Sequence, residues 1–152
     1  MNQLKFGTYK SYDDLYLICT KKTIGSPTVK KSTVEVEGGD GVLDYTEYFG
    51  DVKYSSRQLR FEFESLVPQS QFPELYSAVL DALHGKKVQI VLDEDSDFYY
   101  VGRLSVSDFT NNRGIGSIKI DCDCDPYKYK KNATTVSKDV SGSLEITLPN
   151  LR

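Results

Sequence analysis

The stretch that decides the fold is FPELYSAVLDALHGKKVQIVLDEDSDFYYVGRLSV, residues 72–106. Its first third places apolar side chains at three- and four-residue steps, which predicts an amphipathic helix. Pro73 suits the first turn, where its missing N–H would have no partner, and Gly85 suits a left-handed exit after the last turn. We therefore expect one helix, with His84 in its last turn and its apolar stripe made of Phe72, Leu75, Tyr76, Val79, Leu80 and Leu83.

The remainder of this stretch changes to the two-residue period of strands. Val88, Ile90 and Leu92 share one face of a first strand, and the alternation resumes from Phe98 to Val106. Between them, the run Asp93–Asp97 is too polar and too self-repelling for a strand interior, so we expect a turn there. The central unit is then a helix followed by two strands, with the rest of the chain packed around it.

Alternating segments continue on both sides of this unit, so we expect a mainly β fold with one helix. Residues 23–31 lack any period and predict a long loop or an arm. The segment Leu15–Cys19 is apolar on both faces, which indicates a strand covered on each side or an edge at a subunit contact. The other expected strands contain Leu4 and Phe6, Val34 and Val36, Val52–Glu64, Ile118–Cys124 and Leu144–Leu148.

Turn signals divide the chain further. Gly38-Gly39-Asp40-Gly41 ends a strand, and no helix or Gly-Lys-Ser/Thr ending follows it, so we interpret it as a tight turn rather than a phosphate loop. Asn111-Asn112-Arg113-Gly114 predicts a hairpin. We expect one β domain over residues 5–130. Residues 131–152 are then a linker rich in Thr and Ser with a terminal strand, the possible start of a further domain.

Composition excludes several classes of protein. A length of 152 residues favours one domain with a real core, and a net charge of −3 argues against a dedicated nucleic-acid binder. The odd number of cysteines, three, predicts free thiols in a reducing compartment. No apolar run approaches the roughly 20 residues of a membrane-spanning helix, and residues 1–8 have no signal-peptide core, so we expect no membrane association and folding in a cytoplasm.

No catalytic or cofactor-binding motif is recognisable. His84 stands at a helix end without a nucleophile motif around it, so a catalytic role is not expected. Cys122 and Cys124 share one strand face, and only with Cys19 and His84 would the chain supply four zinc ligands; small buried side chains are the better interpretation. We expect no enzyme, no cofactor and no metal site.

The acidic run resembles the opening of a calcium loop. Phe98 occupies the position that needs glycine, and Leu104 occupies the position of the bidentate glutamate, which excludes an EF-hand. Asn132-Ala133-Thr134 matches a glycosylation sequon, which has no meaning without a secretory route.

Several pieces of the sequence, taken in order, resemble the N-terminal domain of the distal tail protein of long-tailed phages and prophages. The match spans about Lys5 to Lys130, and the order and spacing of the pieces carry it. They are Phe6-Gly7 before Ser11-Tyr12-Asp13-Asp14-Leu15, Gly39-Asp40-Gly41 before Leu43-Asp44-Tyr45, Arg57-Gln58-Leu59-Arg60-Phe61, Leu83-His84-Gly85-Lys86, Tyr99-Tyr100-Val101-Gly102-Arg103 and Asp125-Pro126-Tyr127-Lys128-Tyr129.

This resemblance implies a β-sandwich with one packed helix, related to tail-tube folds, which assembles as a hexameric ring at the tail tip or baseplate of the virion. It implies tail tube, tail hub or tail-associated, and tape measure proteins as partners, with DNA only passing through the lumen and with assembly in the host bacterial cytoplasm. Family members commonly carry a second, galectin-like domain, and this chain stops at Arg152, as a fragment or a short form would.

For the ring we expect subunit contacts at Leu15, Leu17, Tyr45, Tyr99 and Arg103. Two-sided apolar strands find a second cover across a subunit contact, and exposed tyrosines supply the aromatic area that such contacts favour. The alternative is a ligand- or carbohydrate-binding β-sandwich, which needs a cluster of exposed aromatic rings along a groove.

Overall fold

The computed structural model describes residues 3–140 and 142–151, with side chains as far as Asn132. The described residues form a mainly β fold with one α-helix, as predicted. The strands and the helix, in chain order, are β1 Leu4–Phe6, β2 Tyr9–Lys10, β3 Leu17–Ile24, β4 Thr33–Glu35, β5 Val42–Asp44, β6 Arg57–Ser65, α1 Phe72–Leu83, β7 Lys87–Leu92, β8 Phe98–Asn112, β9 Ile115–Cys124, β10 Lys128–Val140 and β11 Gly142–Leu151.

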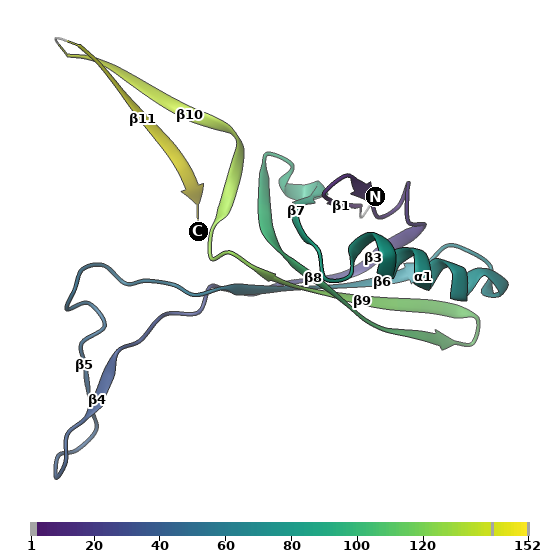
Figure 1. Cartoon of the computed structure of the whole chain (residues 1–152), viewed down its shortest axis with the longest axis horizontal. Coiled ribbons are helices and arrows are strands. Elements are labelled where there is room, and N and C mark those ends of the chain that lie inside the picture. The colour runs from purple at the N-terminus through teal and green to yellow at the C-terminus, as the bar shows by residue number, and fades with distance from the viewer. Residues whose placement is uncertain (1–2, 141, 152) are drawn as a thin grey trace.

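The core lies inside one antiparallel sheet that folds over on itself, with helix α1 alongside (Figure 1). The strand order is β2-β1-β7-β8-β9-β6-β3. Three strands separate β1 from β6 in that order, yet the ring of Phe6 in β1 contacts those of Phe61 and Phe63 in β6, with centroids 5.9 and 6.0 Å apart. Because the two halves of the sheet meet through these rings, the architecture is a sandwich, as expected.

Helix α1 occupies the predicted range and closes this core. Val79 and Leu83 are fully buried, while Tyr76 and Leu80 are half-buried at the edge of the stripe. The helix ends one residue earlier than expected, because His84 has an extended backbone. Gly85 then takes a left-handed φ of +75° and donates its N–H to the carbonyl of Leu104, which turns the chain into β7.

Local turn chemistry sets the register of the longest hairpin. Arg113 and Gly114, between β8 and β9, both have positive φ, 54° and 86°, the conformation that a two-residue hairpin loop requires. The side chain of Asn111 accepts a hydrogen bond of 3.1 Å from the N–H of Gly114. The predicted hairpin is therefore confirmed, and so is the acidic turn, where the 3₁₀ segment Asp93–Asp95 links β7 to β8.

Strands β3 and β6 differ from their predicted bounds. Strand β3 begins at Leu17 and continues to Ile24, and a bulge between Cys19 and Lys21 breaks its alternation, which hid its second half from a periodicity argument. Strand β6 begins only at Arg57, because residues 52–56 belong to a projecting loop.

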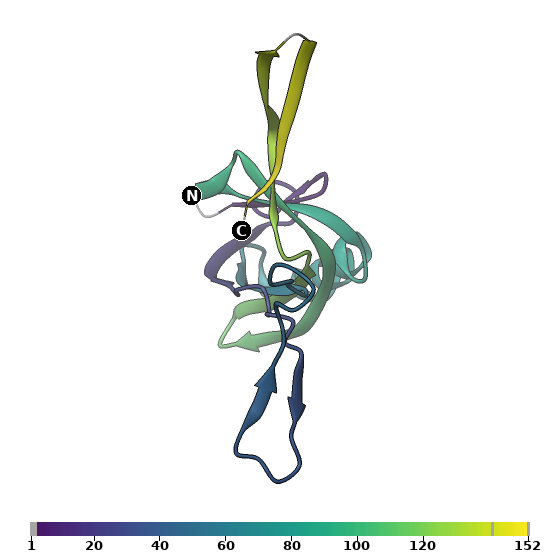
Figure 2. The ribbon, with the colours of Figure 1, turned by 90° about the vertical axis from the view of Figure 1, so that its left-hand side faces the viewer.

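The range expected to be a linker with a terminal strand, residues 131–152, is mostly strand. Strand β10 pairs with β11 in a hairpin, and it joins the body where Tyr129 pairs with Tyr99 and Lys130 with Phe98 of β8. The terminal strand that we predicted finds its partner in β10. The division of the chain at residue 130 stays a prediction. Figure 2 shows this hairpin extending from the body in one direction and β4–β5 in the other.

Candidate assembly interface

The most prominent surface feature is an arm, residues 26–56, which leaves the body between β3 and β6 (Figure 1). Backbone hydrogen bonds fix its root: the N–H of Ser55 donates to the carbonyl of Thr28 over 2.8 Å, and that of Lys30 to the carbonyl of Lys53 over 2.9 Å. The buried guanidinium of Arg57 donates a further bond of 2.8 Å to the carbonyl of Gly25. The arm is therefore a structured extension with a fixed root.

The outer part of the arm is a two-stranded sheet with no cover from the body. Strands β4 and β5 pair only with each other among the described strands. Tyr48 and Phe49 are 77% and 90% exposed, and their rings contact each other edge to face with centroids 4.9 Å apart. Contiguous exposed apolar surface of this kind marks interaction sites. The other exposed apolar residues of the arm are Val29, Val34, Val36, Val42, Leu43 and Tyr45.

The same segment is strongly acidic. Residues 33–52 hold six carboxylates and no basic side chain, a net charge of −6. The whole chain carries −3, so the other residues together carry +3. At the end of β5, hydrogen bonds from the hydroxyl and the N–H of Thr46 lower the pKa of Asp44. The arm therefore combines exposed apolar rings with negative charge, while the rest of the chain is positive.

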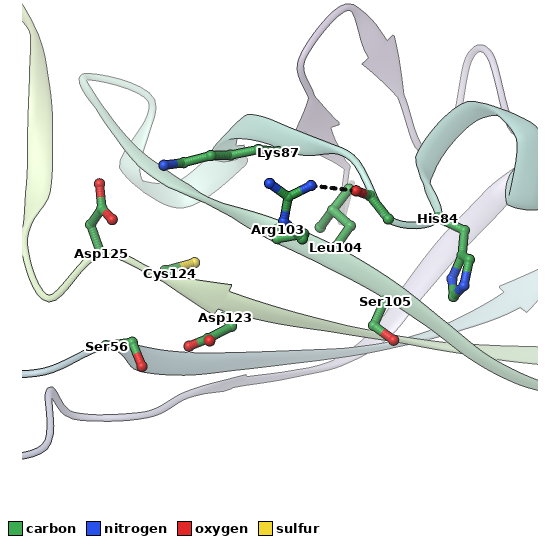
Figure 3. A pocket seen from close by; sticks show the side chains of 10 residues that line it. Ser56, His84, Lys87, Arg103, Leu104, Ser105, Asp123, Cys124 and Asp125 are labelled. Carbon is green, nitrogen blue, oxygen red and sulfur yellow. Dashed lines mark hydrogen bonds between the residues drawn. The ribbon is translucent and has the colours of Figure 1, made fainter.

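A groove lies beside the root of the arm, between the end of α1 and strands β7, β8 and β9, with a volume of about 530 Å³ (Figure 3). Arg103 and Lys87 line one side, and Asp123 and Asp125 line the other. The guanidinium of Arg103 donates a bond of 2.7 Å to the carbonyl of Gly85, which fixes its orientation. No Phe, Tyr or Trp side chain lines this groove among the described residues.

The structure places the five predicted contact residues in different surroundings. Tyr45 is exposed on the arm, and Arg103 lines the groove. Tyr99 stacks on Tyr129, with centroids 5.5 Å apart, and so holds strand β10 to the body. Leu15 and Leu17 are buried within this chain, at 4% and 0% exposure, and have no surface to offer a second subunit. We keep Tyr45 and Arg103 in the proposed interface.

Sequence reasoning missed the aromatic pair Tyr48–Phe49. The available signal was the run Leu43–Phe49, in which apolar and acidic residues mix without the two-residue period of a covered strand. Such a run indicates exposed structure, but only the fold shows that no other element covers it.

The histidine and the cysteines that were considered for catalysis or metal binding make contacts within the fold. The Nδ1 atom of His84 accepts a hydrogen bond of 3.0 Å from the N–H of Val106, which ties the helix end to β8. The sulfur atoms of Cys122 and Cys124 lie 3.1 Å apart, and both residues are buried. The hydrogen bond between these two thiols, together with burial, raises the pKa of Cys122. Burial likewise raises the pKa of Cys19.

Two lysines contact the acidic turn. Lys22 contacts Asp93 and Glu94, and Lys128 donates a bond of 2.7 Å to Asp95. Within the described ranges, no three His, Cys, Asp or Glu side chains are grouped as metal ligands. No helix in the described part of the chain has the length and apolarity to cross a membrane.

Comparison with known proteins finds a solved structure with a similar fold. No family model and no curated sequence matches this chain. In structure the chain is similar to SPP1 Dit (gp 19.1), described as a paradigm of the hub adsorption apparatus in phages that infect Gram-positive bacteria. The TM-score is 0.71 at 15% sequence identity, over 90% of this chain and 55% of that one. The chain thus spans about half the length of SPP1 Dit, and the resemblance to distal tail proteins is confirmed for the fold.

Proposed function

We propose that this chain, which has the fold of the SPP1 distal tail protein, is a non-enzymatic structural protein of a phage tail. The fold likeness over 90% of the chain is the observation that carries this proposal. In the finer form of the proposal, six copies close into a ring at the tail tip. The ring joins the tail tube to the hub, contacts the tail tube, tail-associated and tape measure proteins, and lets DNA pass through its lumen. The ring forms in the host cytoplasm and remains in the virion.

The arm supports an assembled state. It exposes apolar side chains that a monomeric protein in water would normally cover. A projecting hairpin that contacts a different surface of a second copy makes a head-to-tail contact, and repetition of such a contact closes a ring when the rotation per subunit allows it. A ring subunit needs a contact of this type on each side.

The test is the size and shape of the purified protein. Light scattering coupled to size exclusion gives the mass over a range of concentrations, and negative-stain electron microscopy gives the shape. We expect a closed six-membered ring with a central opening. A protein that stays monomeric up to high concentration, or that forms only open filaments, would contradict the ring.

A matched control removes the arm alone. Replacing residues 31–52 with Asn-Gly keeps the hydrogen bond between Lys30 and Lys53 and closes the root with a two-residue turn. This variant should keep its core and unfold near the temperature of the native chain, while it stays monomeric.

The ligand-binding alternative gains no support from the geometry. Sugar-binding sites use aromatic rings along a hollow, whereas no Phe, Tyr or Trp side chain lines the groove beside the arm, and the exposed rings of Tyr48 and Phe49 lie in the turn that follows β5. Selective, saturable binding on a glycan array would favour that alternative over the structural role.

A further inference from the structure

We propose that the groove of one copy receives the exposed aromatic pair of the arm, Tyr48 and Phe49, from a second copy. The pair lies in the turn that follows β5, and this turn is called the aromatic tip below. This inference rests on the proposed function, because it names the contact through which the ring subunits recognise one another. The contact is head-to-tail: each copy gives its tip to one neighbour and receives the tip of the other in its own groove.

Size is the first argument. The groove has a volume of about 530 Å³. A second cavity of about 510 Å³ lies on the arm itself, and those on the body measure about 170 to 220 Å³. Burying two aromatic side chains removes roughly 300–500 Å² from water. That is about half of the ~800 Å² that each partner contributes to a stable interface, and the rest of the arm supplies more.

Charge is the second argument, and it sets the orientation. Glu47 and Asp51 flank the aromatic tip, while Lys87 and Arg103 line one side of the groove. Lys87, Glu47 and Asp51 form no ion pair with any described residue, so these charges are available to a neighbour. A guanidinium beside an aromatic face adds a cation–π attraction.

The opposite side of the groove carries Asp123 and Asp125. These carboxylates repel the acids beside the tip, so only the orientation that turns Glu47 and Asp51 toward Lys87 and Arg103 is favourable. Complementary and repulsive charges together fix the register of an interface in this way.

The arm cannot fill the groove of its own chain. Its root is held by the backbone bonds at Thr28 and Lys30, and Figure 1 shows it running away from the body at the end of β3 and the start of β6. Ser56, the last residue of the arm, lies in the lining of the groove, so the groove adjoins the root of the arm. The groove is therefore open to part of another molecule, and the excess positive charge of the other residues makes the acidic arm of a second copy a fitting partner.

The experiment uses two variants of the full chain. The tip variant carries Tyr48→Ser and Phe49→Ser, and the groove variant carries Lys87→Glu; circular dichroism and thermal unfolding verify that both keep the fold. We expect each to associate at least tenfold more weakly than the native chain. The control, Ile115→Ser, changes a residue that is 51% exposed on the β8–β9 turn and should assemble like the native chain.

Mixing the two variants tests the direction of the contact. The groove variant has an intact tip and the tip variant has an intact groove, so an equimolar mixture should form a one-to-one dimer and nothing larger. A third chain, with Lys87→Glu and Glu47→Lys together, should recover part of the assembly, because this pair of opposite charges is exchanged.

Each outcome decides a separate question. If the native chain assembles and both variants assemble equally well, the inference is wrong while the proposed function stands. If both variants are monomeric but fail to pair when mixed, the head-to-tail contact is refuted. If the native chain itself never assembles, the ring and this inference fail together.

Discussion

Lys22 of strand β3 donates a hydrogen bond of 2.7 Å to the carboxylate of Asp93, 71 residues further along the chain. Strand β3 is one edge of the main sheet, and Asp93 begins the turn that follows β7, in the other half of the sandwich. The same ammonium group contacts Glu94. This pair therefore ties together two parts of the sheet that no ladder of backbone hydrogen bonds connects.

The pair predicts a dependence of stability on pH. Partial burial, the largest single effect, would raise the pKa of Asp93, but the hydrogen bonds from Lys22 and from the N–H of Gln3, with the positive charge of Lys22, together outweigh it, and the pKa is lowered. A lowered pKa in the folded state means that the contribution is present at neutral pH and is lost as pH falls below about 4. Partial burial alone would lower the pKa of Lys22, but bonds to Asp93 and Glu94 raise it, so the contribution is also lost above about pH 10.5.

We expect Asp93→Asn to lower the free energy of unfolding by about 1 kcal/mol at neutral pH, a modest value because solvent partly screens the pair. Urea unfolding at about pH 7 and about pH 3 measures the effect, which should be smaller at the lower pH, where the carboxyl group begins to be protonated. Glu62→Gln is the control: the Lys21–Glu62 pair is 3.9 Å long and exposed on both sides, and its loss should cost less than about 0.5 kcal/mol. A difference that persists unchanged at low pH would refute this account.

A substitution at Gly102 tests how closely the backbones of β8 and β9 approach each other. A Cβ atom there would lie 2.5 Å from the carbonyl oxygen of Asp123 and 2.7 Å from the sulfur of Cys122. The first of these is backbone that cannot move aside, so Gly102→Ala should destabilise the fold by about 1–3 kcal/mol, as overpacking does. The control is Gly39→Ala on the arm, where the nearest atom is 3.4 Å away. Equal unfolding temperatures for the two variants would contradict the close approach.

The three cysteines predict a thiol titration. All three are buried, and burial raises the pKa of Cys19, so little reactive thiolate is present. Ellman's reagent at about pH 8 should find no fast-reacting thiol in the folded protein. After denaturation it should find all three. A thiol that reacts within seconds in the folded protein would show that the core around β9 is open.

The arm predicts a pattern of limited proteolysis. Glu35, Glu37 and Glu47 lie on it, in exposed backbone with few contacts, where proteases cut first. A glutamyl endopeptidase should cleave after these residues while Glu62 and Glu64, in the middle of the sheet, stay intact. In the assembled protein the cuts near Tyr48 should slow. If the protease instead cuts the body before the arm, the arm is covered in the monomer and this prediction is wrong.

The sequence was most informative where local signals decide the structure. The apolar stripe and Gly85 are sufficient for helix α1, and Asn111-Asn112-Arg113-Gly114 is sufficient for its hairpin, because both depend on neighbours along the chain. The alternation of Leu59, Phe61 and Phe63 likewise predicted the buried face of β6.

Features that depend on distant residues were harder to predict. Leu15 and Leu17 were expected at a subunit contact, because a strand that is apolar on both faces has the same pattern whether its own chain or another covers it. The bulge in β3 breaks the alternation, so the periodicity did not predict the full length of that strand. The pairing of β10 with β11 was not predicted, because the composition of this segment is typical of linkers. The exposure of Tyr48 and Phe49 depends on the whole fold, and no local sequence pattern predicts it.

The arm has a mechanical consequence. It is connected to the body at the end of β3 and the start of β6, two paired strands that leave the sheet at the same end. A pull on the tip therefore runs parallel to β6 and loads the ladder between β6 and β9 in shear, from Arg57 opposite Cys124 to Glu64 opposite Ser117. Under shear these hydrogen bonds share the load together instead of opening one at a time, so tension on the tip meets the full strength of the central sheet.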